Sequence, residues 1–115
     1  MAYVVLREGS SASAEALRAF AAERVPERAA VPVRIEIIPQ MPMTAVGKIF
    51  KPRLRHLAIE RVCGEVLRAA GIEATVTARD DKRRGTVATI RLAAAAAQGA
   101  ATDALARLPL AIEFE

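Results

Sequence analysis

The feature that most constrains the fold is a loop over residues 39–47, which begins at Pro39 and ends at Gly47. It follows residues 33–38, where apolar and polar side chains alternate as in a half-buried strand. Pro52 comes soon after it and suits the first turn of a helix, because the N–H that proline lacks would have no helical partner there. Lys48 is therefore predicted to stand on a turn between a strand and a helix. Movement of the whole module can carry it from there to an anionic group.

Upstream of the loop, the sequence predicts one strand and one helix. Residues 2–6 are apolar and rich in strand-forming types. Ser13 is typical of a helix N-cap, and Glu15 lies in the first turn, where its charge suits the helix dipole. The helix then carries one apolar face at helical spacing and ends before Pro26, and this face consists of Leu17, Phe20 and Ala21.

Downstream of the loop, periodicity and breakers predict two more helices and three strands. An apolar stripe indicates a helix that begins near Pro52 and stops at Gly71. Two alternating segments around a polar turn at residues 80–85 indicate a β-hairpin. In order, the predicted elements are a helix over 52–70, strands over 72–78 and 86–92, an Ala-rich helix over 93–108 with Gly99 as a break, and a strand over 110–114.

From Val33 onward these elements follow the order β-α-β-β-α-β, which is the ferredoxin-like order. Order alone does not fix strand pairing, and the strand at 33–38 could instead pair with residues 2–6. We therefore predict an α+β chain with a small mixed sheet, helices packed on it, and a hairpin-helix-strand appendage. Residues 1–60 would carry the Gly-Lys motif, and residues 61–115 would form a C-terminal α+β extension.

Composition argues against several classes of function. The formal net charge is +4, but three Phe, one Tyr and no Trp leave little material for stacking on nucleic-acid bases. Cys63 and His56 are the only residues of their kinds, so we expect a buried thiol, no intrachain disulfide and no metal site. The longest apolar run, residues 92–97, is far below the roughly 20 residues of a membrane span. With no signal peptide evident either, we expect a cytoplasmic protein without a membrane span.

The string around Lys48 closely resembles the C-terminal motif of AMP-forming acyl-CoA synthetases, members of the adenylate-forming superfamily. The preceding residues are also similar, and the likeness extends from residue 2 to about residue 60. One departure is Ala30, where many members of the family have a lysine. The matching motif positions are Pro42, Thr44, Gly47, Lys48, Ile49, Lys51, Leu54 and Arg55.

This resemblance implies that Lys48 serves the adenylation half-reaction, and that Gly47 and, more weakly, Thr44 are motif positions that contact a co-substrate. Lys51, Arg53 and Arg55 lie where the family commonly has basic residues, and could bind phosphates of ATP or CoA. A solvated first helical turn is the simpler explanation of those three, as a solvated hairpin tip is for residues 82–84.

The resemblance also implies what the chain works with. ATP and CoA would be co-substrates, a carboxylic acid would be the substrate, and Mg²⁺ would be bound in an N-terminal adenylation domain of the same polypeptide. We expect the chain alone to bind none of these and to be inactive, and we expect no nucleic-acid partner.

The residues suit this chemistry on their own terms. Joining a carboxylate to the α-phosphate of ATP brings two anions together, and a compact, mobile ammonium can stabilise the charge that gathers on the phosphoryl oxygens. Gly47 lets the backbone come close without a Cβ. The string is not a P-loop, because Pro42 and Ile49 stand where that motif needs Gly and Ser or Thr.

Several alternatives remain open at this point. The chain could be a free-standing, non-catalytic ferredoxin-like binding module or a weak nucleic-acid binder. Gly-Lys could also be simply a polar turn with no role in function. Within the superfamily, it could belong to a peptide-synthetase adenylation domain, a luciferase-like enzyme, or an aryl- or fatty-acid-CoA ligase. Residues 61–115 lack a serine in a carrier-protein context, which favours a CoA ligase. The string at 45–51 resembles that of fatty-acid-type synthetases, and this resemblance implies an acyl chain as the substrate.

Overall fold

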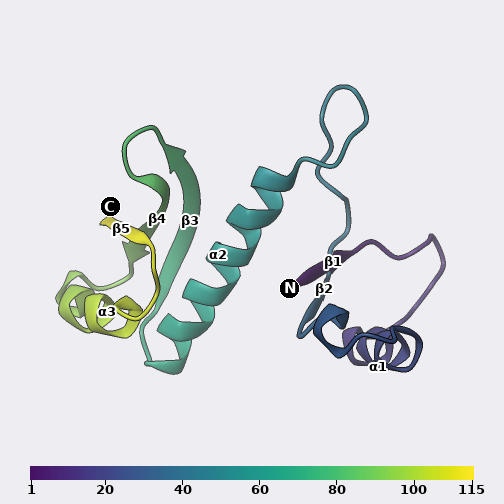
Figure 1. The fold of residues 1–115 in the computed structure, drawn as a ribbon. Coiled ribbons are helices and arrows are strands. Elements are labelled where there is room, and N and C mark those ends of the chain that lie inside the picture. Colours follow the sequence, from purple (N-terminus) through teal and green to yellow (C-terminus); the bar gives the residue numbers. More distant parts are fainter. The chain divides into compact units, whose positions relative to one another are not determined.

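The computed structural model describes all 115 residues, in two compact units, Met1–Lys51 and Pro52–Glu115 (Figure 1). Both units combine helices and strands, which confirms the α+β class. The compact units divide at the start of helix α2 (Lys51–Ala69), so the division predicted at residues 60 and 61 falls inside that helix.

The first unit is built on a parallel strand pair, β1 (Ala2–Val4) and β2 (Ile35–Ile37), with Ala2 opposite Ile35. Helix α1 (Ala14–Arg24) and a short 3-10 helix (Arg28–Ala30) lie between the two strands in the chain. Ser13 is the N-cap of α1, and its hydroxyl oxygen accepts a hydrogen bond of 3.1 Å from the Ala16 N–H. The predicted cap is thus confirmed, while both strands are shorter than predicted.

The apolar face predicted for α1 is not buried, because α1 contains no buried residue. Phe20 is 57% exposed, and the Arg24 guanidinium lies over its ring at 4.7 Å from the centroid. Within Met1–Lys51 the one buried side chain is Ile35 on β2. The first unit therefore leaves much of its apolar surface uncovered.

The second unit contains a three-stranded sheet in the order β3 (Ala74–Asp81), β4 (Gly85–Leu92) and β5 (Ala111–Phe114). β3 and β4 form the predicted antiparallel hairpin, and β5 pairs in parallel with β4. The predicted helix over 93–108 is shorter, because it consists of a 3-10 helix (Ala95–Ala97) and α3 (Gln98–Leu105). The break in the helix was predicted at Gly99, but the change from 3-10 to α-helix comes before it, at Gln98, and Gly99 lies inside α3.

Of the two pairings left open for the strand at 33–38, the structure forms the one with residues 2–6, and no single ferredoxin-like sheet is present. β2 pairs with β1 in a sheet of its own, and the other three strands form a second sheet. Both parallel pairs, β1–β2 and β4–β5, are joined by segments that contain a helix, since a parallel pair needs a crossover that no tight turn can supply. The helical crossovers permit these two parallel pairings, and the elements from β2 onward follow the order β-α-β-β-α-β.

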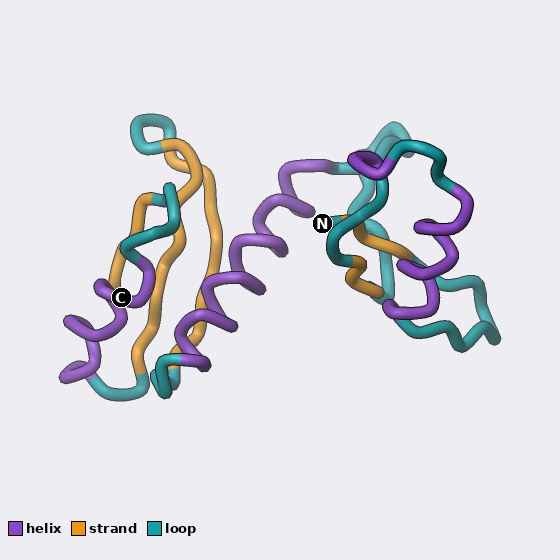
Figure 2. Tube along the Cα trace, turned by 60° about the horizontal axis from the view of Figure 1, so that its bottom comes forward, coloured by secondary structure: helices purple, strands orange, loops and turns teal.

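The core of the second unit lies between α2, α3 and one face of this sheet. In both views α2 runs beside β3 (Figures 1 and 2), and the Ala78 N–H of β3 donates a 3.0 Å hydrogen bond to Glu60 Oε1 on α2. The thiol of Cys63 is buried, as predicted. The buried members of the cluster are Cys63, Leu67, Ile72, Ala88, Ile90, Ala101 and Leu105.

Helix α2 ends as predicted at Gly71, which has a φ of +75°. The Gly71 N–H donates to the Arg68 carbonyl at 3.0 Å, and the Ile72 N–H donates to the Leu67 carbonyl at 2.9 Å. These two bonds define a Schellman motif, in which Ile72 and Leu67 also join the same apolar cluster. No helix of the chain is both long enough and apolar enough to span a bilayer.

Candidate functional site

Lys48 lies on a small β-hairpin of the first unit, which we call the Lys48 hairpin and define as residues 42–50. Met43 and Ile49 face each other in an antiparallel bridge, and the Phe50 N–H donates to the Pro42 carbonyl at 2.9 Å. Nearer the tip, the Thr44 N–H donates to the Lys48 carbonyl at 2.7 Å. The chain therefore presents Lys48 on a hydrogen-bonded turn, and not on an irregular loop.

The tip of the hairpin is a three-residue loop that ends at Gly47. The Gly47 N–H donates to the Thr44 carbonyl at 3.0 Å, and Gly47 has a φ of +82°, in the left-handed region. A three-residue hairpin loop ordinarily ends in such a residue. A Cβ at Gly47 would meet no atom within 4 Å, so within this chain the glycine serves backbone conformation and not space.

The side chain of Lys48 is exposed, and the structure records no hydrogen bond or ion pair for its ammonium group. Its neighbours on the hairpin are apolar and also exposed, with Val46 at 80% and Met43 at 52%. Apolar side chains that are exposed together on a surface are typical of a region that a partner covers.

The basic residues after the hairpin divide between the two units. Lys51 is exposed at the end of the first unit, while Arg53 and Arg55 belong to the second. Arg53 is already paired, with its Nη1 at 3.3 Å from Glu60 Oε1. Within the first unit, the structure brings Lys48, Gly47 and Thr44 together on the Lys48 hairpin.

A contact between His56 and Asp80 was not predicted from the sequence. His56 Nε2 lies 3.0 Å from Asp80 Oδ1, and the Thr86 hydroxyl donates to the same oxygen at 3.2 Å. The hydrogen bond from His56 lowers the pKa of Asp80 below its usual value. Together with Arg55 these residues line a cavity of about 60 Å³, which is too small for a nucleotide.

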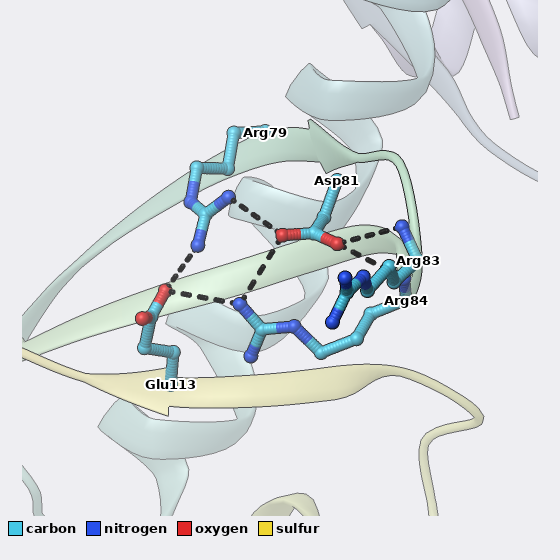
Figure 3. Close-up of polar contacts among 5 residues, drawn as sticks. All are labelled: Arg79, Asp81, Arg83, Arg84 and Glu113. Atoms are coloured by element: carbon cyan, nitrogen blue, oxygen red, sulfur yellow. Dashed lines mark hydrogen bonds and ion pairs between the residues drawn. The ribbon is translucent and has the colours of Figure 1, made fainter.

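A second unpredicted cluster occupies the sheet face opposite the core (Figure 3). Arg79 Nη2 lies 2.6 Å from Glu113 Oε2 and its Nη1 lies 3.4 Å from Asp81 Oδ2, so the guanidinium joins β3 to β5. Arg84 Nη2 is 3.4 Å from Asp81 Oδ2 and 3.9 Å from Glu113 Oε2. The register places Arg79 opposite Val87, which is fully buried although it points away from the helices.

The charges in this cluster satisfy one another. Backbone N–H groups of Arg83 and Arg84 donate to Asp81 at 2.8 and 3.0 Å, and these two bonds hold the pKa of Asp81 at about 2. The hydrogen bond from Arg79 lowers the pKa of Glu113. Within the basic tip at 82–84 the Arg84 side chain is therefore ion-paired, with Asp81 and Glu113, so the interpretation as a solvated tip does not hold for Arg84.

Comparison with known proteins gives a family match that reaches into the Lys48 hairpin. The sequence model described as the AMP-binding enzyme C-terminal domain matches residues 1–48, a segment that ends at Lys48 itself. Residues 1–48 are therefore similar to the C-terminal domain of AMP-binding enzymes, which confirms the resemblance seen in the sequence.

The chain is also 36% identical over 96 residues to the marinolic acid–CoA ligase of Pseudoalteromonas sp. (strain SANK 73390). The aligned segment covers 82% of this chain and 15% of that ligase, so the chain spans a small part of the relative's length. An alignment of 96 residues extends well past residue 48, and the relative therefore shares part of the second unit. No solved structure matches the chain.

Proposed function

We propose that this chain forms the C-terminal part of an AMP-forming acyl-CoA synthetase, and that Lys48 supplies the cation for adenylation of a fatty or other carboxylic acid. The observation that carries the proposal is the position of Lys48. It is an exposed lysine without an ion-pair partner, on a hydrogen-bonded hairpin, at the end of the segment that matches the AMP-binding enzyme family.

In the proposed reaction, an oxygen of the substrate carboxylate attacks the α-phosphorus of ATP, and the bond to pyrophosphate breaks. Negative charge gathers on the phosphoryl oxygens as the two anions approach. The Lys48 ammonium would lie against these oxygens and stabilise the charge as it develops. CoA would then displace AMP in a second step, for which the lysine is not needed.

The uncovered apolar surface of the first unit supports a large partner domain. Val33 is 83% exposed and Val46 is 80% exposed, while Ile35 is the only buried side chain of that unit. Covering such side chains is favourable by about 25 cal/mol per Å² of apolar surface removed from water. We propose that the N-terminal adenylation domain of the same polypeptide covers part of this surface when Lys48 enters the active site.

ATP, CoA and the acid would be held mainly by that domain. This chain has no group of three or more His, Cys, Asp or Glu residues that could hold a metal ion. We propose that the Mg²⁺ that accompanies ATP is bound with it in the partner domain. Because ATP and CoA are cytoplasmic co-substrates, we propose a cytoplasmic location. A CoA ligase is favoured over a peptide synthetase or a luciferase because the relative that shares part of the second unit is a CoA ligase.

The proposal is tested by measuring ATP–pyrophosphate exchange, which reports adenylation, in the full-length ligase with Lys48→Ala. Removing one charge-stabilising donor costs about 100- to 1,000-fold in rate, and we expect a loss of that order. Thioester formation from preformed acyl-adenylate should proceed in the same variant.

Lys82→Ala is the matched control, because Lys82 is an exposed lysine at the hairpin turn of the second unit. It should leave both half-reactions unchanged. Exchange at the parent rate in Lys48→Ala would overturn the assignment.

A further inference from the structure

The tip of the Lys48 hairpin leaves one backbone donor without a backbone acceptor. The Thr44 carbonyl, which could have accepted from Lys48, instead accepts from the Gly47 N–H at 3.0 Å. The Lys48 N–H is bound by the Thr44 hydroxyl oxygen at 3.1 Å. The Thr44 hydroxyl therefore replaces the Thr44 carbonyl as the acceptor for the Lys48 N–H, because the Gly47 N–H occupies that carbonyl.

Thr44 holds Lys48 from both sides of its backbone. Its N–H donates to the Lys48 carbonyl at 2.7 Å, and its hydroxyl accepts from the Lys48 N–H. These two bonds constrain the backbone dihedrals of Lys48 and so the direction in which its Cα–Cβ bond leaves the chain. A lysine side chain is long and flexible, and the direction of its first bond sets the region that its ammonium can reach.

The surroundings of the hairpin add little further restraint. Residues 45–50 are all exposed, and no buried side chain anchors the tip. In such a site water competes for each hydrogen bond, and the turn depends on the bonds that its own residues make.

We propose that Thr44 is a positioning residue for the adenylation reaction. Its hydroxyl, by accepting from the Lys48 N–H, holds the turn that aims the Lys48 ammonium at the reacting phosphate and carboxylate. This inference rests on the proposed function of Lys48. It differs from the direct contact with a co-substrate that the sequence motif implies for Thr44, because it assigns the hydroxyl to the lysine's backbone.

The experiment compares three variants of the full-length ligase in ATP–pyrophosphate exchange. Thr44→Val keeps the shape of the side chain and removes the hydroxyl, and Thr44→Ser keeps the hydroxyl. Thr102→Val is the matched control, because Thr102 is an exposed threonine of the second unit whose hydroxyl bonds the Gln98 carbonyl at 2.9 Å.

Thr44→Val removes one exposed hydrogen bond, and we expect this loss to lower kcat of exchange about fivefold and to leave KM for ATP unchanged. Thr44→Ser should restore kcat to within about twofold of the parent, and Thr102→Val should match the parent. A parental kcat in Thr44→Val would overturn the inference, as would a raised KM for ATP at unchanged kcat, which indicates direct binding of ATP.

A double-mutant cycle with Lys48→Ala separates positioning from a general loss of structure. If Thr44 acts through Lys48, Thr44→Val has no further effect on the residual exchange of Lys48→Ala. A further fivefold loss in that background would overturn the inference, because the hydroxyl would then act independently of the lysine. Exchange that is unaffected by Lys48→Ala would overturn the proposed function instead, so the two failures are distinct.

Discussion

Gly47 allows the conformation of the Lys48 hairpin to be tested separately from the space around it. Its φ is +82°, and a Cβ built there meets no atom within 4 Å. Gly47→Ala therefore adds the cost of placing an L-residue in the left-handed region and no clash within the chain. That cost is about 1–2 kcal/mol, which corresponds to a turn that is about 5- to 30-fold less populated.

Gly47→Asn separates the two reasons for a glycine. Asparagine adopts the left-handed region more readily than alanine, although its side chain is larger. If conformation decides, kcat of ATP–pyrophosphate exchange in the full-length ligase should fall in the order Gly47, Gly47→Asn, Gly47→Ala. If the asparagine variant is as slow as the alanine variant or slower, close approach of a ligand or partner domain requires the glycine, and the conformational reasoning is refuted.

Three further predictions concern the second unit. They are tested on the 115-residue chain, two by urea unfolding and one by the reactivity of a thiol. Leu67 is 1% exposed in the core, so Leu67→Ala should lower the free energy of unfolding by about 2–5 kcal/mol; a loss below about 1 kcal/mol would contradict the assigned core. The N–H groups of Arg83 and Arg84 lower the pKa of Asp81 from 3.8 to about 2. The ionised carboxylate therefore stabilises the folded chain fully at pH values above the pKa of the unfolded chain, and this stabilisation is lost as the pH falls toward 2. Asp81→Asn should remove that part of the pH dependence, and an unaltered acid profile would count against it. Burial raises the pKa of Cys63, whose thiol should react with an aromatic disulfide reagent only after denaturation; prompt reaction of the native chain would show that the core is open.

Local signals in the sequence predicted local structure well. Ser13 is an N-cap because its own side chain reaches an N–H three residues away, and Gly71 stops α2 because its φ is positive. Both depend on residues within a few positions, which the sequence displays directly. The β3–β4 hairpin followed in the same way from alternation around a polar turn.

Long-range pairing could not be predicted with the same success. The choice of β1 as the partner of β2 depends on which crossover forms, and the alternation at residues 33–38 is compatible with either sheet. The contact between Arg79 and Glu113 joins residues 34 positions apart and depends on the register of β5 on β4. The exposure of Phe20 likewise depends on what covers α1, which helical periodicity does not specify.

For the candidate site too, the sequence predicted the residues but not the contacts between them. The motif singled out Lys48, Gly47 and Thr44 because residue types at fixed spacing carry that information. The bond from the Lys48 N–H to the Thr44 hydroxyl was not foreseen, because it depends on the loop closing so that Gly47 takes the Thr44 carbonyl. The pair between Arg53 and Glu60 joins residues seven positions apart on one helix, and helical pairs are normally predicted only at spacings of three or four, so it could not be foreseen.

The central claim is that Lys48 acts in adenylation and not in thioester formation. The most direct measurement is the ratio of ATP–pyrophosphate exchange to thioester formation from preformed acyl-adenylate, in one preparation of the full-length ligase with Lys48→Ala. The account predicts that this ratio falls at least about 100-fold relative to the parent enzyme. A ratio equal to that of the parent would contradict it, whether both half-reactions were retained or both were lost.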